Sequence, residues 1–139
     1  MALRKNAKVD LIKRVPLFSE LGKRELNEVA AIADEIDLGE GKELIVEGNP
    51  GREFFVIVEG DAEVRHGDRE VNRLGAGDFF GEIALLEDRP RTATVVAASP
   101  IRALVITARS FRTLLEHSPE IEDKVMTARN ARLSPEDEL

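Results

Sequence analysis

Short apolar or alternating segments, each closed by a turn, fill the middle of this chain. They recur roughly every eight to twelve residues, a spacing typical of an antiparallel sandwich or barrel. Glycine-bearing turns separate them, because glycine readily adopts the positive φ angles that tight turns require. The sequence therefore predicts strands at 35–38, 43–46, 53–58, 62–65, 70–74, 93–98 and 101–106.

Helical spacing of apolar residues is confined to the two ends of the chain. A first helix is expected to end before Pro16, and a second one from about Gly22 has a single apolar stripe: Leu26, Val29, Ala30 and Ala33. Near the other end, Thr107 is placed to cap a helix, and Ser118 followed by proline marks the start of the next. That last helix is expected to end at about Leu133.

One domain is expected to cover residues 1–139, a length sufficient to bury a core. The predicted fold is mainly β with flanking α: an eight-stranded antiparallel β-roll, jelly-roll-like, with N-terminal and C-terminal helices. We expect the N-terminal helices over 8–34 and the β-roll over 35–107, with a motif segment at 79–95. The C-terminal helices should cover 108–133, followed by an acidic tail at 134–139.

Composition excludes several classes of protein. The 20 Lys and Arg residues are outnumbered by 27 Asp and Glu, for a net charge of −7, so nucleic acid is not an expected partner. No apolar run approaches the roughly 20 residues that span a bilayer, so no membrane association is expected. There is no cysteine, and the first residues have no apolar secretion signal. The expected location is the cytoplasm.

The residue pattern does not favour an enzyme. The two histidines, His66 and His117, have no identifiable carboxylate and nucleophile partners. No Walker-type loop with its lysine is present, and the spacing of histidines does not suit a metal. We therefore predict that the chain is not an enzyme and holds no metal or cofactor.

The segment 79–95 has the chemistry of an anion site. Gly81 precedes a short predicted helix and has no Cβ to keep a ligand away from backbone N–H groups. Those groups and the helix dipole attract an anion. Glu82 adds an acceptor and Arg91 adds a fork-shaped cationic donor. Together they suit a small phosphate ester that also has a hydroxyl group.

Three parts of the sequence share the pattern of one known family. They are Phe80-Gly81-Glu82-Ile83-Ala84-Leu85 with Arg91-Thr92-Ala93, the glycine-punctuated run at 47–60, and Val15-Pro16-Leu17-Phe18. On these residues, the segment 79–95 resembles the phosphate-binding cassette of the cyclic-nucleotide-binding domain family. That family includes regulatory subunits of cAMP-dependent kinases, catabolite activator proteins and cyclic-nucleotide-gated channels. The resemblance covers about residues 9–133, and the chain looks like a stand-alone bacterial-type single domain.

The resemblance implies a role for each residue of the cassette. Arg91 would pair with the exocyclic oxygens of a cyclic phosphate, since a guanidinium donates two hydrogen bonds at once. Glu82 would accept a hydrogen bond from the ribose 2′-hydroxyl. The backbone N–H groups of Ile83 and Ala84, after Gly81, would complete the phosphate cradle. The implied ligand is cAMP or cGMP.

Ligand selectivity depends on Thr92 and on the end of the site that faces the base. In the family, a threonine beside the arginine can bond phosphate and in some members favours guanine, but it also occurs in domains that bind both nucleotides. We favour cAMP, with cGMP or dual specificity as the alternative. By resemblance, the base pocket includes Val64, Val71, Leu74 and Phe80, and either Met126 or Arg129 would act as its lid.

The function that the resemblance implies is regulatory. Binding of a cyclic nucleotide would reposition the C-terminal helices, and the signal would pass to a protein partner in trans or to ligand-dependent self-association. Such coupling requires that the ligand prefer one helix arrangement over the other. The alternative is a protein-interaction scaffold of the same fold that needs no nucleotide.

Overall fold

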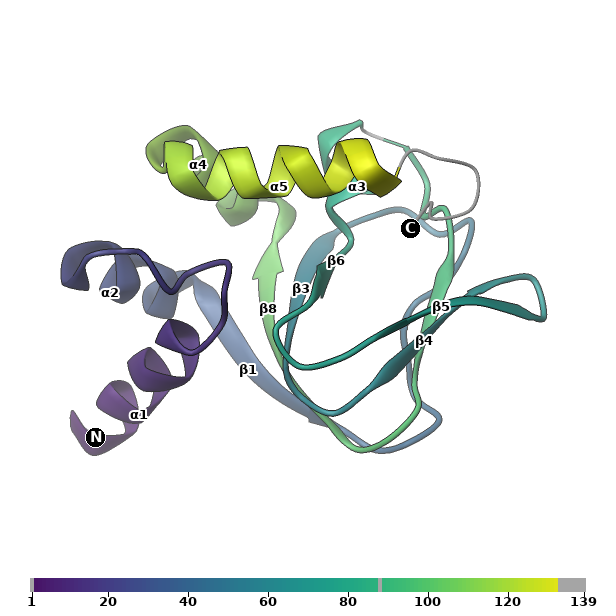
Figure 1. Cartoon of the computed structure of the whole chain (residues 1–139), viewed down its shortest axis with the longest axis horizontal. Helices are drawn as coiled ribbons and strands as arrows, with labels where there is room; N and C mark the ends of the chain where they lie inside the picture. The colour runs from purple at the N-terminus through teal and green to yellow at the C-terminus, as the bar shows by residue number, and fades with distance from the viewer. Residues whose placement is uncertain (1, 88, 133–139) are drawn as a thin grey trace.

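The computed structural model describes residues 2–87 and 89–132, in which helices at both ends of the chain flank a β-roll (Figure 1). The N-terminal helices are α1 (Ala2–Lys13) and α2 (Lys23–Ile32), and the C-terminal helices are α4 (Ala108–His117) and α5 (Pro119–Arg132). A short helix, α3 (Glu82–Leu86), interrupts the strands. The strands are β1 (Ala33–Leu38), β2 (Glu43–Ile45), β3 (Glu53–Glu59), β4 (Ala62–His66), β5 (Arg69–Leu74), β6 (Phe79–Phe80), β7 (Thr94–Ala97) and β8 (Ile101–Thr107).

The strands form two four-stranded sheets, with the orders β1-β8-β3-β6 and β2-β7-β4-β5. Every recorded strand pair is antiparallel. The predicted fold class is therefore confirmed: the protein is mainly β, with eight antiparallel strands and flanking helices.

Two apolar cores result from the alternation of side chains along the strands. In β8, Leu104 and Ile106 face the helices, whereas Ala103 and Val105 face the interior of the roll. The first core joins one sheet to α1, α2, α4 and α5, and the second lies between the two sheets. The helices at the two ends of the chain thus pack against one face of the roll, whereas the short α3 contributes to both cores.

Several element boundaries differ from the sequence-based expectation. The first helix begins at Ala2, well before residue 8, and the first strand begins at Ala33, not at Glu35. Ala33 is buried as the apolar stripe predicts, but it pairs with Ile106 in the sheet and is not helical. The strand β6 was missed because two residues are too few to show a period. Leu133 and the predicted tail at 134–139 lie outside the described residues.

The helix termini follow the capping pattern that the sequence predicts. The Thr107 hydroxyl accepts a hydrogen bond from the Ser110 N–H at 3.2 Å, and the Ser118 hydroxyl accepts one from the Ile121 N–H at 3.4 Å. The first N–H of α4, at Ala108, donates to the Arg52 carbonyl at 2.8 Å. This bond ties α4 to the start of β3. Within residues 2–87 and 89–132, no helix is long and apolar enough to cross a membrane.

Candidate ligand-binding site

The short helix α3 begins at Gly81, which has a left-handed backbone with φ of 95°. A Cβ at this position would lie 2.9 Å from Arg91 Nη1 and 3.0 Å from the Glu53 carbonyl oxygen. Glycine is therefore needed both for its φ angle and for the space that the arginine occupies.

Arg91 is held by main-chain oxygens from two separate elements. Its Nη1 donates to the Gly81 carbonyl at 2.9 Å, and its Nη2 donates to the Glu53 carbonyl at 2.6 Å. Its backbone is also fixed, because the Arg91 N–H donates to the Asn49 carbonyl at 2.8 Å. Only 6% of the residue is exposed. The guanidinium is therefore oriented before any ligand arrives, which reduces the entropic cost of binding.

The positively charged guanidinium of Arg91 is poorly solvated. Burial lowers the pKa of Arg91, and the nearby carboxylates of Glu53 and Glu82 partly offset this effect. Glu82 is completely buried, with 0% exposure. A desolvated guanidinium interacts more strongly with an anion than an exposed one does. The arrangement can bind an anion and, through Glu82, a hydrogen-bond donor beside it.

Gly51 packs directly against the cassette. A Cβ on Gly51 would lie 2.6 Å from the Ala84 Cβ and 3.5 Å from Arg91 Cζ. Sequence reasoning assigned no role to Gly51 or to Glu53. The glycine in the turn before β3 was a usable signal, but the contribution of Glu53 is a backbone carbonyl, which no residue type reveals.

The structure gathers the predicted phosphate-side residues around α3. Ala84 is 5% exposed, and Ile83 is fully buried with its side chain in the core of the roll. First-turn N–H groups of a helix lack acceptors within the helix, so those of Ile83 and Ala84 are suited to a ligand. The Thr92 Oγ1 atom is buried and has no hydrogen-bond partner among the described residues.

The predicted base-side residues lie mostly within the core. Val64, Leu74 and Phe80 belong to the buried cluster inside the roll, where Phe80 stacks on Phe55 with ring centroids 5.0 Å apart. Val71 is only partly buried against the same cluster. Of these residues, Val71 therefore has the most accessible surface, and the contact of all four with a base stays a prediction.

The two predicted lid residues lie on α5, which runs beside α3 (Figure 1). Met126 and Arg129 are both half-buried. Arg129 Nη2 donates to Asn130 Oδ1 at 3.0 Å, and its Nε is buried without a hydrogen-bond partner in the described part of the chain. The structure thus brings α5 close to the cassette, and the lid role of either residue stays a prediction.

The β-roll and the Arg91 clamp, meaning the Arg91 guanidinium bonded to the Gly81 and Glu53 carbonyls, agree with the family to which the sequence is matched. The family model for the cyclic nucleotide-binding domain matches residues 35–118, more than half of the chain. The chain belongs to the cyclic nucleotide-binding domain family.

A curated relative gives the match in sequence. The chain is 44% identical over 113 residues to the cAMP-dependent protein kinase regulatory subunit of Mycosarcoma maydis. The alignment covers 73% of this chain but 21% of that protein, so the chain spans about a fifth of the length of this relative.

Solved structures give the match in fold. PKAR CBD2 bound to Sp-2Cl-cAMPS aligns with a TM-score of 0.74 and 26% identity over 93% of each chain. The cAMP-bound PfPKA-R aligns with a TM-score of 0.79 and 27% identity, covering 94% of this chain and 48% of that one. The regulatory subunit of a cAMP-independent protein kinase A from Trypanosoma brucei aligns at 0.85 with 23% identity, over 99% of this chain and 48% of that one. This last likeness shows the fold alone.

Proposed function

We propose that this domain is a regulatory sensor that binds cAMP. The observation that carries the proposal is the Arg91 guanidinium, which two backbone carbonyls orient beside the buried Glu82. Such a site offers a fixed cation for a singly charged cyclic phosphate and a carboxylate for the adjacent ribose hydroxyl. It needs no metal and no catalytic group, and we place its action in the cytoplasm.

In this proposal the phosphate and ribose contacts come from the cassette. Arg91 donates to the exocyclic phosphate oxygens, and the N–H groups of Ile83 and Ala84 complete the cradle after Gly81. Glu82 accepts a hydrogen bond from the ribose 2′-hydroxyl, which separates ribose from deoxyribose ligands. The similar structures of PfPKA-R bound to cAMP and of PKAR CBD2 bound to Sp-2Cl-cAMPS support this choice of ligand.

We infer that the signal leaves through the C-terminal helices and acts on a protein partner in trans. The α3 residue Leu85 lies in the same buried core as Phe111 of α4 and Val125 of α5. In addition, Arg112 of α4 donates to the Leu85 carbonyl at 3.4 Å. A ligand that shifts α3 would therefore shift the packing of α4 and α5. The regulatory role of the kinase relative supports a partner in trans.

A second candidate ligand, cGMP, is favoured by Thr92. A buried hydroxyl without a partner costs free energy, so it is expected to gain a hydrogen bond when ligand binds. A phosphate oxygen of either nucleotide or the exocyclic amine of guanine would satisfy it. Dual specificity would follow if the phosphate is its partner.

Thermal-shift titration with cAMP, cGMP and linear AMP tests the proposal. A ligand that binds only the folded state adds about 2.7 kcal/mol of stability at a hundred times its Kd. We expect cAMP to raise the melting temperature most and linear AMP to have little effect. If neither cyclic nucleotide raises it at millimolar concentration, the sensor proposal is wrong and a nucleotide-independent scaffold replaces it.

Light scattering after size exclusion tests the output. A change in mass when cAMP is added would place the signal in self-association, whereas a constant mass would favour the partner in trans. This measurement does not depend on the identity of the partner.

A further inference from the structure

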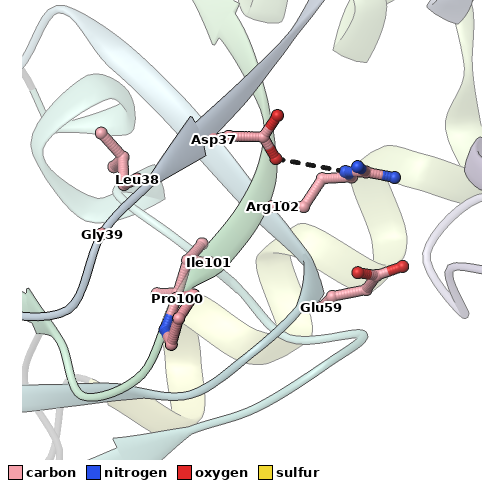
Figure 2. Close-up of a pocket in the computed structure, with 7 residues that line it drawn as sticks. All are labelled: Asp37, Leu38, Gly39, Glu59, Pro100, Ile101 and Arg102. Carbon is pink, nitrogen blue, oxygen red and sulfur yellow. Dashed lines mark hydrogen bonds and ion pairs between the residues drawn. The ribbon is translucent and has the colours of Figure 1, made fainter.

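A pocket of about 320 Å³ lies where β1 and β3 end and β8 begins (Figure 2). Its lining residues are Asp37, Leu38, Gly39, Glu59, Pro100, Ile101 and Arg102, none of which belongs to the cassette. Glu53 and Glu59 lie at opposite ends of β3, so about 20 Å of strand separates the Arg91 clamp from this pocket. The pocket is therefore distinct from the nucleotide site.

A row of charges crosses three strands on one side of the pocket. Arg102 of β8 pairs in register with Asp37 of β1 and with Glu59 of β3. A register shift after Ile57 places Glu59 opposite Arg102, as bulges commonly re-aim side chains. Arg102 Nε bonds Asp37 Oδ1 at 3.2 Å, and in Figure 2 the Glu59 carboxylate points into the space beside this pair.

Acids outnumber bases in this row. Glu35 lies two residues before Asp37, on the same face of β1, and both are exposed, as is Glu59. The bond to Asp37 and the nearby charges of Glu59 and Glu35 raise the pKa of Arg102. Two carboxylates and one guanidinium line the pocket, and the nearby Glu35 adds a further negative charge. A further cation is therefore attracted to this position.

The opposite wall of the pocket is apolar. Leu38, Pro100 and Ile101 lie across from the charged row in Figure 2. The turn beneath is tightly fixed, because Gly60 has φ of 99° and a Cβ there would overlap the Pro100 carbonyl oxygen. The backbone at this end of the pocket is thus fixed. Leu38 and Pro100 offer an apolar surface there, whereas Ile101 is almost fully buried in the core of the roll.

We propose that this end of the roll is a docking surface for a basic segment of a protein partner. An arginine or lysine side chain of the partner enters the pocket. Its methylene stem lies on the surface formed by Leu38 and Pro100, and its charged head lies beside Glu59, since Asp37 is already bonded to Arg102. Long cationic side chains commonly bury their stems in this way. The negative charge of the surface repels nucleic acid and phosphorylated peptides. The proposal does not require that the domain bind a cyclic nucleotide.

Fluorescence anisotropy with a short labelled peptide of alternating arginine and alanine tests the proposal on the whole chain. The matched peptide replaces arginine by citrulline, which keeps the shape and removes the charge. We expect the arginine peptide to bind with a salt-sensitive affinity and to shift the backbone amide NMR signals of Gly60 and Ile101, but not that of Gly81. Equal binding of the two peptides, or shifts located elsewhere, would overturn the proposal.

A pair of variants separates docking from general charge attraction. Glu59→Gln removes a carboxylate that lines the pocket, and Glu116→Gln removes an exposed carboxylate on α4, away from it. We expect Glu59→Gln to weaken binding of the arginine peptide by up to roughly fivefold, the range for one exposed ion pair. Glu116→Gln should leave the affinity for this peptide unchanged. An equal loss in both variants shows attraction by net charge alone and contradicts the docking surface. Thermal melts check that both variants are folded.

Discussion

The phosphate end and the base end of the proposed nucleotide site are built from different materials. At the phosphate end, a charged side chain is held by backbone carbonyls and by glycines that leave room for it. At the base end, the predicted contacts Val64, Leu74 and Phe80 are apolar side chains that already fill the core of the roll. The first end is defined by hydrogen bonds from one side chain to the backbone, and the second by how apolar side chains pack between the two sheets.

This difference explains why one end is easier to assign than the other. A buried guanidinium has few structural reasons to exist, because burial without compensation is costly. A buried valine or leucine is ordinary core. The following predictions test whether the phosphate end carries most of the affinity and the base end most of the selectivity.

The largest effect is expected from Arg91→Ala. Loss of a charged hydrogen bond costs about 1.5–3 kcal/mol, so cAMP affinity measured by calorimetry should fall roughly ten- to over a hundredfold. Arg52→Ala is the matched control, because Arg52 is exposed and immediately follows Gly51. If the Arg91 variant binds cAMP as well as the parent does, the phosphate end is wrongly assigned.

The next effect is expected from Gly51→Ala, which tests the support of the clamp. The new methyl group would lie 2.6 Å from the Ala84 Cβ, and overpacking of this kind typically costs about 1–3 kcal/mol. Both the melting temperature and the cAMP affinity should fall. Gly39→Ala is the control, since no atom lies within 4 Å of its added Cβ; similar behaviour of the two variants would argue against the contact.

Arg91→Lys should make the affinity depend on pH. Burial lowers the pKa of the cation at this position. The unperturbed pKa of lysine, about 10.4, is lower than that of arginine, so burial brings the pKa of the lysine variant closer to neutral pH. Only the charged amine binds the phosphate, so affinity should be present at neutral pH and be lost as pH rises through the lowered pKa. Calorimetry at several pH values would show a decline for the variant and a flat profile for the parent. Parallel profiles would contradict a desolvated cation.

The smallest effect is expected from Thr92→Val, which probes the border between the two ends. Removal of one neutral hydrogen bond costs about 0.5–1.5 kcal/mol, or roughly two- to tenfold in affinity. If only the affinity for cGMP falls, the Thr92 hydroxyl bonds guanine. If the affinities for both nucleotides fall equally, the hydroxyl bonds the phosphate. Thr113→Val, on the exposed face of α4, is the control. Unchanged affinities for both ligands would remove Thr92 from the site.

The sequence predicted the parts of the molecule that depend on local chemistry. Turn glycines, the caps at Thr107 and Ser118, and the order of strands and helices follow from residue type and spacing, and the structure bears them out. Ala33 shows the limit, because its burial fits a helix stripe and a strand equally well. Its pairing with Ile106, far along the chain, decides for the strand.

Within the site, the same limit separates Gly81 from Glu53. The glycine is visible as a residue type before a short helix, whereas Glu53 contributes through a main-chain oxygen that any residue would supply. The acidic row around Arg102 was equally hidden, since only strand register brings Asp37 and Glu59 opposite Arg102, with Glu35 nearby. Contacts that involve backbone atoms, or that depend on strand register, become visible only in the folded structure.

The bond between the Arg52 carbonyl and the Ala108 N–H has a practical consequence. It fixes the backbone of residue 52 at the junction of β3 and α4, while the side chain points outward and is exposed. Because the chain contains no cysteine, Arg52→Cys would create a single thiol for attaching an environment-sensitive dye. The domain could in this way be converted into an optical reporter, with the dye beside the element whose movement is proposed to transmit the signal.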